Sequence, residues 1–447
     1  MSKPPGLPGS KPVFGHTLQF RKGPLKFFEK CHDEIGDIAW LQSPFRDVVL
    51  VFKPDYIKYI LQENNKAFRK SFGYDELKAL LGEGLLTSEG ETWKKQRRLA
   101  QPAFHKERIA QLVNIMGDVV EETVADFKKK YKSGDEVNIT FEMNKLALDI
   151  VSRTLFQTDV SKGQIDELNH ALGIVIEVGA KRIRDPFQPP RWVPTKSNRD
   201  AKEAVEKIRN IVSGIIEKRV KSTERFDDLL DMFVHTIDEE TGEKMTMEAL
   251  MDEVMTIYIA GHETTANALA FTWYLLSTHQ AEKQKLQDEI KTLDVEKPAM
   301  MQLRELKYHR MVIDESLRLY PPAWIIGRQG LKEEKMGNYE LPSMCTYGIP
   351  VYVIQRSKQY WNDPEKFIPE RFSEENSATI PKFAYFPFGG GPRLCIGQMF
   401  AIYEMQIAIF ILWKHFDFSI SPDYKLEIEP LITLRTKNPI LMKINFK

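Results

Sequence analysis

The sequence predicts a mainly α-helical protein with small β-sheets, folded as a single large domain around a long central helix. Three observations support this prediction. Apolar residues recur three and four positions apart from about Gly84 to Leu319, which is the period of helices with one buried face. Strand-like segments are short and lie toward the two ends of the chain. No stretch has the composition of a flexible linker between domains.

The chain divides into three parts. Residues 1–83 are richer in β-prone segments, and residues 84–320 form the helical body. Residues 321–447 contain a glycine-rich loop, a further helix and the last β-prone segments. Because residues 1–16 are rich in Pro and Gly, we expect them to follow an extended path over the surface.

Local signals place the elements within these parts. Short β-prone pieces occupy Asp37–Leu41 and Val48–Phe52. Four prolines between Arg184 and Pro194 require a non-helical connection there. The central helix is expected over about 246–278, because Thr246 is a suitable N-cap and an acidic residue follows in the first turn.

Beyond Pro322 the chain becomes irregular and β-prone, for example over Gly348–Ile354. A last strong helix is expected from near Ile396 to about Phe416, directly after a glycine run. The end of the chain contributes only short β-prone segments.

Composition excludes several classes of protein. Lys+Arg and Asp+Glu are both 63, so the net charge is zero and the basic surplus of a nucleic-acid-binding protein is absent. Three cysteines argue against a disulfide framework and favour a reducing cytoplasm. The N-terminus has no signal-peptide pattern, although a removed anchor would leave no trace. The apolar stretch Val254–Leu276 contains charged and polar residues, so a buried helix is favoured over a membrane span.

The segment from Phe386 to Gly397 is the most informative one. Three consecutive glycines allow unusual backbone angles and a close approach to a flat group. Cys395 follows where a helix is expected to begin, and the N–H groups and dipole there favour its thiolate form. A thiolate is a suitable ligand for a soft metal. By itself the cysteine could also be a small buried side chain and the glycines a turn; a zinc site would need further ligands nearby, which the sequence lacks.

This segment resembles the haem-binding signature of the cytochrome P450 family, Phe-x-x-Gly-x-Arg-x-Cys-x-Gly. Every defined position matches, and the residues are Phe388, Gly391, Arg393, Cys395 and Gly397. The resemblance implies the P450 fold and haem b, with Cys395 as the axial ligand of the iron. It further implies that Phe388 packs near the sulfur, that Arg393 contacts a haem propionate, and that Gly389 and Gly397 shape the cofactor-binding loop.

The central helix carries Ala-Gly-His-Glu-Thr-Thr at 260–265, where packing alone would favour apolar residues. Thr264 could simply donate a hydrogen bond to a carbonyl one turn earlier, and Glu263 could form an ion pair with a basic residue. The resemblance instead implies an acid–alcohol pair, in which Glu263 and Thr264 deliver protons during oxygen activation. It also implies that Ala260 faces the haem and that Gly261 leaves room for dioxygen.

Two further pairs lie on single helical faces and match family motifs. Glu315 and Arg318 are three residues apart; they could form an exposed ion pair, whereas the resemblance implies a structural network with Arg371. Trp93 and Arg97 are four residues apart and, together with Arg328, are expected to contact haem propionates. Gln355 departs from the His that many family members carry there, without consequence for the chemistry.

By position, the resemblance places a mostly apolar substrate pocket along five segments. Its expected residues are Leu85, Leu86, Ile259, Ala323, Trp324, Ile325 and Ile432, with Tyr258 and the Phe187/Trp192 connection nearby. Some of these residues could merely pack the core. The sequence is closer to fatty-acid-hydroxylating branches, so a fatty acid or a similar lipid or terpenoid is the expected substrate.

The expected function is a monooxygenase that inserts one atom of dioxygen, its co-substrate, into a hydrophobic molecule. Electrons from NAD(P)H would arrive through a separate ferredoxin, flavodoxin or reductase, and Lys94, Lys95 and Arg98 could form a basic docking patch or a merely solvated face. Two alternatives remain: a peroxygenase driven by hydrogen peroxide, and a non-catalytic haem-thiolate sensor or electron carrier. The intact Glu263–Thr264 pair favours the monooxygenase over both.

Overall fold

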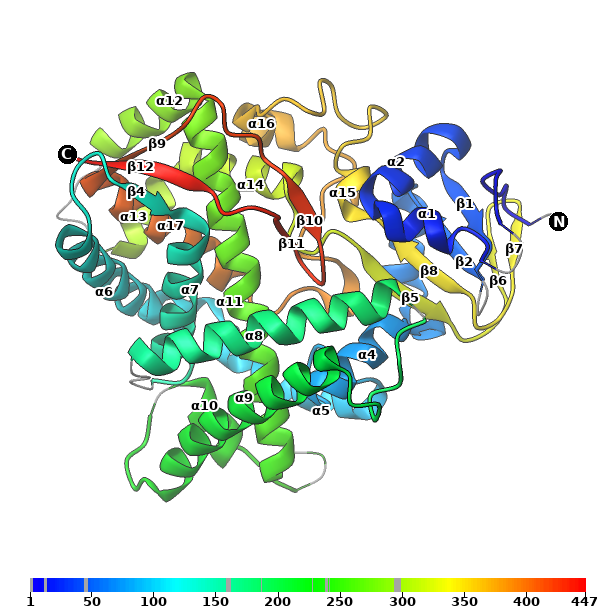
Figure 1. The fold of residues 1–447 in the computed structure, drawn as a ribbon, viewed down its shortest axis with the longest axis horizontal. Coiled ribbons are helices and arrows are strands. Elements are labelled where there is room, and N and C mark those ends of the chain that lie inside the picture. The colour runs from blue at the N-terminus through cyan, green and yellow to red at the C-terminus, as the bar shows by residue number, and fades with distance from the viewer. Residues whose placement is uncertain are drawn as a thin grey trace.

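Helices dominate the protein, and small sheets gather mainly at one end of it (Figure 1). The structure is a computed structural model that describes residues 3–11, 14–43, 47–157, 162–185, 187–226, 228–237, 240, 242–292 and 299–447. The N-terminus lies at the sheet end and the C-terminus at the opposite end. The predicted fold class, mainly α with small β-sheets, is confirmed.

The helices of the described chain follow the predicted three-part order. The N-terminal part holds α1 (Thr17–Lys22), α2 (Pro24–Ile35), α3 (Pro54–Lys58) and α4 (Phe72–Leu81). The helical body holds α5 (Gly90–Ala100), α6 (Lys106–Lys130), α7 (Ile139–Leu155), α8 (Lys162–Arg184), α9 (Lys196–Lys221), α10 (Leu229–His235), α11 (Met247–Thr278), α12 (Gln280–Lys291), α13 (Ala299–Glu305) and α14 (Lys307–Leu319). The last part holds α15 (Val351–Ile354), α16 (Glu374–Ser377) and α17 (Gln398–His415).

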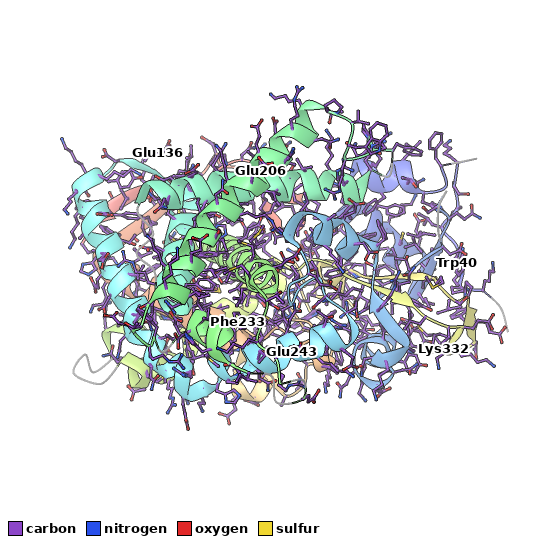
Figure 2. The ribbon with its side chains drawn as sticks, turned by 90° about the horizontal axis from the view of Figure 1, so that it is seen from below. Trp40, Glu136, Glu206, Phe233, Glu243 and Lys332 are labelled. Carbon is purple, nitrogen blue, oxygen red and sulfur yellow. The ribbon has the colours of Figure 1, made fainter. Side chains whose placement is uncertain are left out.

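The largest sheet has five strands in the order β1-β2-β8-β5-β3, and only the β2–β8 pair is parallel. Its strands are β1 (Ile38–Leu41), β2 (Val48–Val51), β3 (Phe68–Lys70), β5 (Ile326–Gly330) and β8 (Thr346–Ile349). The smaller sheets are β4-β12-β9, β6-β7 and β10-β11, formed by β4 (Glu136–Asn138), β6 (Glu334–Met336), β7 (Tyr339–Leu341), β9 (Phe416–Ile420), β10 (Ile428–Pro430), β11 (Leu434–Thr436) and β12 (Leu441–Phe446). In Figure 2, Trp40 and Lys332 mark the end of the protein that holds the large sheet, and Glu136 marks the opposite end of the protein.

Two sequence-based expectations were wrong in detail. The β-prone run 348–354 is a strand only up to Ile349; Pro350 ends it, and the four apolar residues that follow form the short helix α15. The N-terminal segment does not simply run over the surface. Gly6 pairs with Trp40 at the sheet edge, and Leu7 and His16 are buried. Its prolines therefore stabilise an extended segment that packs against the sheet.

The central helix α11 begins and ends as predicted. The Thr246 side chain accepts a hydrogen bond from the Ala249 N–H at 3.1 Å, which caps the first turn. Most of its 32 residues are buried, so the helix is enclosed by protein on nearly all sides. None of the helices in the described ranges combines the length and the apolarity that crossing a bilayer requires. The cytoplasmic location stays a prediction.

A fully buried ion pair connects α14 to the last part of the chain. Arg318 donates to both carboxylate oxygens of Glu315, at 2.7 and 2.8 Å, and both side chains are 0 % exposed. Arg371 also donates to Glu315, at 3.3 Å. The remaining Arg318 donors bond to the backbone oxygens of Gln355, Pro364 and Lys366. The predicted proximity of Glu315, Arg318 and Arg371 is therefore present, and an exposed ion pair is excluded; their role in cofactor loading stays a prediction.

Gln355 extends this network to the glycine-rich loop. Its side-chain amide donates to the carbonyls of Leu317 and Arg318, each at 3.0 Å, and its oxygen accepts from the Phe386 N–H at 3.0 Å. Farther along the loop, Gly391 has a φ of +68°, and a Cβ there would lie 1.8 Å from the Leu61 carbonyl oxygen. The loop is therefore fixed at one end by hydrogen bonds and farther along by close backbone packing.

We predict that Glu315→Gln lowers the free energy of unfolding by about 3–5 kcal/mol, because Arg318 would keep a buried charge without its counterion. Thermal unfolding monitored by circular dichroism measures the change. The control is Glu206→Gln on α9, labelled in Figure 2, because Glu206 pairs with Lys202 in solvent and its loss costs under about 1 kcal/mol. Equal, small shifts in both variants would contradict the structural role of the buried pair.

We also predict that Gly391→Ala disrupts the loop far more than Gly134→Ala disrupts its own turn. Both glycines have positive φ, so both variants carry a backbone strain of roughly 1–3 kcal/mol. Only Gly391 lacks space for a methyl group, whereas no atom lies within 4 Å of a Cβ at Gly134. The fall in melting temperature of each variant is measured, and the difference between the two falls gives the effect of the clash with Leu61 apart from the backbone strain. Similar falls in both variants would show that the contact with Leu61 is unimportant.

Candidate active site

The middle of α11 has one face that is not covered by the rest of the protein. Ala260 is exposed and Thr264 is partly exposed, although the helix around them is buried. The Thr264 hydroxyl donates to the Ala260 carbonyl oxygen at 2.7 Å. This is the local bond that a threonine makes in any helix, but the side chain also lines a cavity, described below.

Glu263 is buried beside this face. Its Oε1 accepts a hydrogen bond from the Thr433 hydroxyl at 2.8 Å, and Thr433 also accepts from the Asn267 amide at 3.3 Å. Among the described residues, Glu263 Oε2 has no hydrogen-bond partner. Burial raises the pKa of Glu263 to about 7, and the Thr433 bond and the charge of Arg435 lower that pKa only in part. The carboxyl therefore changes its protonation state near neutral pH. No lysine, arginine or histidine of the described residues is in direct contact with it.

The side-chain position of Gly261 faces a neighbouring helix, and the expected role of this glycine in leaving room for dioxygen stays a prediction. A Cβ at this position would point toward α7 and lie 3.1 Å from Val151 Cγ2. Because α11 and α7 pack closely along their lengths, the glycine is explained by helix contact.

The thiol of Cys395 is not covered by the residues around it. The Cys395 N–H donates to the Phe388 carbonyl at 3.0 Å, and the sulfur accepts from the Gly397 N–H. The Cys395 side chain has accessible surface, although the surrounding protein desolvates the thiol and raises its pKa. The side chain therefore borders a space inside the protein. The Gly397 bond and the charge of Arg97 both lower the pKa of the thiol and so oppose the effect of burial. α17 begins at Gln398, and the thiolate form of Cys395 with haem bound stays a prediction.

Cationic side chains gather beside this loop. Arg393 pairs with Glu89, and its guanidinium lies over the Trp93 ring, 4.3 Å from the centroid. Arg97 donates to the Leu394 carbonyl at 3.0 Å, and Arg328 donates only to the Gly327 carbonyl at 2.9 Å. In the part of the chain that is described, Arg97 and Arg328 thus have no carboxylate partner.

Lys70 is a further member of this group that the sequence did not reveal. It is buried and donates to the carbonyls of Ser88 and Leu85, at 2.8 and 3.2 Å. Burial, with repulsion from Arg393 and Arg328, lowers its pKa to about 7. Arg328 and Arg393 thus lie close to Lys70 and to each other, and Glu89 pairs with Arg393; this local excess of positive charge suits a bound anion.

The site fits haem on these observations. No cluster of three His, Cys, Asp or Glu side chains occurs among the described residues, so no cage of protein ligands for a metal ion is present there. Haem brings its own nitrogen ligands and needs one axial donor, which Cys395 can supply. Its propionates are carboxylates, and guanidinium groups bind carboxylates with a matching fork of donors.

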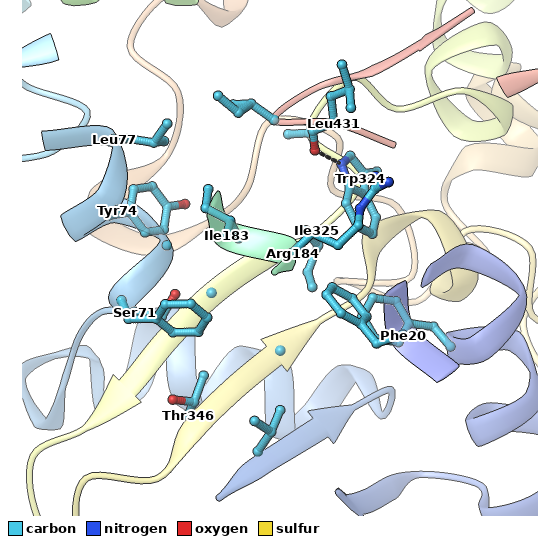
Figure 3. Close-up of a pocket in the computed structure, with 18 of the residues that line it drawn as sticks. Phe20, Ser71, Tyr74, Leu77, Ile183, Arg184, Trp324, Ile325, Thr346 and Leu431 are labelled. Carbon is cyan, nitrogen blue, oxygen red and sulfur yellow. Dashed lines mark hydrogen bonds between the residues drawn. The ribbon is translucent and has the colours of Figure 1, made fainter. Parts of the chain in front are cut away.

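A cavity of about 380 Å³ adjoins the exposed face of α11 (Figure 3). Of the residues expected in the pocket, those that line it are Leu86, Ile259, Ala323, Trp324, Ile325 and Ile432. Leu85 does not; its N–H donates to Glu253 at 3.1 Å. Tyr258 instead stacks on Phe156, and Phe187 and Trp192 are exposed. Ala260, Glu263 and Thr264 line the same cavity.

Several cavity residues were missed by the sequence analysis. They come from the N-terminal helices, from α4 and from the end of α8, and include Phe20, Phe28, Tyr74, Leu77, Ile183 and Arg184. Amphipathic patterns marked these segments as helical but did not show which apolar face borders a cavity. The missed residues give the cavity aromatic walls and a single arginine.

The proposed basic docking patch on α5 is largely neutralised. Lys94 lies 2.6 Å from Glu91, Arg98 lies 2.8 Å from Glu240, and Lys95 lies 3.7 Å from Glu243. These ion pairs weaken the hypothesis that the three side chains attract an acidic partner.

Comparison with known proteins identifies the family. The family model described as Cytochrome P450 matches residues 4–444. The chain is 32% identical to the Cyclooctat-9-en-7-ol 5-monooxygenase of Streptomyces melanosporofaciens, over 90% of this chain and 86% of that protein. It is 35% identical to Cytochrome P450 72A13 of Arabidopsis thaliana, over 84% and 75% of the two chains, and 33% identical to a Cytokinin hydroxylase of the same plant, over 86% and 76%. The chain belongs to the cytochrome P450 family and is a cytochrome P450 monooxygenase.

Proposed function

We propose that this P450 hydroxylates a largely apolar molecule that binds in the cavity beside α11, with electrons delivered by a separate redox partner. The observation that carries the proposal is the lining of that cavity. Apolar side chains make up most of its wall, and the two polar groups Glu263 and Thr264 face it from the helix. Such a cavity binds a hydrophobic substrate and exposes it to a defined set of proton-donating groups.

In this proposal Cys395 would bind the haem iron through its sulfur, and Arg97, Arg328, Arg393 and Trp93 would hold the propionates. When bound through a cysteine thiolate, haem supplies the activation of dioxygen. Phe388 and Gly389 shape the loop around the cysteine; Phe388 packs against the main hydrophobic core, and Gly389 adopts a φ of +75°. The loop thereby keeps Cys395 in a fixed position relative to the protein core.

Glu263 and Thr264, which line the cavity, transfer protons in this proposal. Because the pKa of Glu263 is about 7, the carboxyl is partly protonated at neutral pH and can both give and regain a proton. Thr433 fixes one of its oxygens, and the other oxygen is buried with no hydrogen-bond partner among the described residues. The Thr264 hydroxyl, one residue farther along α11, can accept a hydrogen bond while it donates to the Ala260 carbonyl.

The substrate class follows from the cavity walls and is consistent with the relatives. Aromatic and branched aliphatic side chains from several elements surround the space, so a lipid or terpenoid with a long or bulky apolar body is favoured. One relative is named for an alcohol of the cyclooctatin group and another for cytokinins. We propose an apolar substrate of this general size, and a ferredoxin, flavodoxin or NAD(P)H-dependent reductase as the partner.

We predict that Thr264→Ala uncouples the reaction. Product formed per dioxygen consumed should fall roughly tenfold or more, because a positioned proton-transfer group is lost while the cavity is preserved. The measurement combines oxygen uptake, NAD(P)H oxidation and product yield with surrogate redox partners. Thr272→Ala is the matched control: Thr272 makes the same bond one turn back, to Ala268 at 2.7 Å, but is buried in the core.

Equal coupling in the two variants would contradict the role of Thr264. The wild-type protein also tests the reaction class, because turnover with hydrogen peroxide but none with the redox partners would identify a peroxygenase. Absence of turnover under both conditions, with a range of lipids and terpenoids, would favour a sensor or electron carrier.

We predict that Glu263→Gln flattens the pH dependence of stability. The folded-state pKa of Glu263 is raised to about 7, whereas the unfolded carboxyl ionises near 4.5. Between these values the folded state binds the extra proton, so the folded protein loses stability as pH rises, by on the order of 3 kcal/mol for this group. Melting temperatures of both proteins from pH 5 to pH 8 give the difference; parallel curves would contradict a raised pKa.

A further inference from the structure

The cavity contains one cationic side chain that the proposed chemistry does not use. Arg184 is the last residue of α8, and it is the only lysine or arginine among the described residues that line the cavity. Figure 3 shows Arg184 near Ile183, Trp324 and Ile325 at the end of α8. A guanidinium group at the edge of an apolar wall is costly to desolvate unless it binds an anion.

The hydrogen bonds of Arg184 leave most of its donors unused. One guanidinium nitrogen donates to the Pro430 carbonyl on β10, and no carboxylate in the described chain lies within ion-pair distance. Arginine carries five N–H donors in a planar fork. Because Arg184 lines the cavity, its remaining N–H donors are available to a ligand there.

The nearest acidic residues already have partners. Glu429 raises the pKa of Arg184 through its charge, but its carboxylate accepts hydrogen bonds from Arg435 at 3.2 and 3.3 Å. Asp185, next along the chain, pairs with Arg21 at 3.0 Å. Burial is the largest effect on Arg184 and lowers its pKa, as expected for a cation without a close counterion.

Among the described residues of the cavity wall, no other side chain offers free cationic donors. Both ring nitrogens of His16 are already in hydrogen bonds: Nδ1 accepts from the Gln42 N–H at 3.2 Å, and Nε2 lies 2.8 Å from the Leu7 carbonyl oxygen. Glu263 is the only acidic residue among the described lining residues, and it bonds to Thr433 instead. The described wall thus has one cationic position, Arg184, among mostly apolar and neutral polar side chains.

We propose that Arg184 binds the carboxylate of an amphipathic substrate, so that the preferred substrates are carboxylic acids with a long or bulky apolar body. This inference rests on the proposed function, because it assigns the substrate class of the same cavity. A carboxylate matches the fork of one guanidinium, whereas a phosphate dianion would need further cations, which the described lining lacks. Arg184 is thus a specificity-determining residue.

The test compares two ligands that differ only in the head group, dodecanoate and dodecan-1-ol, with the haem-loaded protein. Dissociation constants come from isothermal titration calorimetry and from the spin-state shift of the ferric haem. The wild type should bind dodecanoate about tenfold or more tightly than the alcohol, since charge-assisted pairs are stronger than neutral ones. In Arg184→Gln this preference should fall to about twofold or less, and Arg184→Lys should retain part of it.

Arg182→Gln is the matched control. Arg182 lies half a turn earlier on α8, but it bonds to Asn198 and to the Pro189 carbonyl and does not line the cavity. Its variant should keep the full preference for the acid. Equal affinity of the wild type for the two ligands would overturn the proposal, as would an unchanged preference in Arg184→Gln.

Failure of this inference differs from failure of the proposed function. If neutral apolar compounds are hydroxylated with no preference for acids, the monooxygenase proposal stands and the role of Arg184 is wrong. If acids bind through Arg184 but no turnover occurs with any electron source, the binding site stands and the proposed reaction is wrong.

Discussion

The site depends on one buried cation, Arg318. Its five N–H donors make hydrogen bonds to Glu315 and to three backbone carbonyls, and its guanidinium lies over the Trp361 ring, 4.9 Å from the centroid. A charge without solvent access is tolerated only when it is fully paired and hydrogen-bonded. These contacts therefore determine where the chain from residue 355 to 371 runs against α14. Gln355 extends the same arrangement to Phe386, where the Cys395 loop begins.

The two sides of the site differ in charge in a way that suits their proposed tasks. On the loop side, Arg328, Arg393 and Lys70 lie close together with Glu89 paired to Arg393, and Arg97 donates to the loop at Leu394. The α11 side has no cation in contact with Glu263, and burial keeps this carboxyl partly protonated at neutral pH. One side is therefore prepared for anionic propionates, and the other for proton transfer in an apolar cavity.

Much of this arrangement could be predicted from the sequence. The α11 boundaries followed from its N-cap and apolar pattern, and the positions of Glu263, Thr264 and Cys395 followed from short motifs with fixed spacing. Long-range packing could not be predicted this way. Lys70 reaches the cationic cluster through β3, and Arg184 reaches the cavity because α8 ends there. Neither position has a local signal, since an isolated Lys or Arg on an amphipathic segment is usually solvated.

Context also decided the cases in which sequence reasoning was wrong. Leu85 was expected in the pocket, but its N–H bonds to Glu253 and the residue does not line the cavity. The β-prone run 348–354 is a strand only up to Ile349, because Pro350 ends it and the next residues form α15. Local composition alone decided neither case.

The assignment of Cys395 as the haem ligand is the central claim, and the carbon monoxide complex of the reduced protein tests it most directly. A thiolate-bound haem gives a red-shifted Soret band in this complex. We expect that band in the wild type and in Cys31→Ser and Cys345→Ser, because these two thiols are buried elsewhere in the core. We expect Cys395→His to lose it while still binding haem. A haem-loaded Cys395→His protein that keeps the red-shifted band would contradict the assignment.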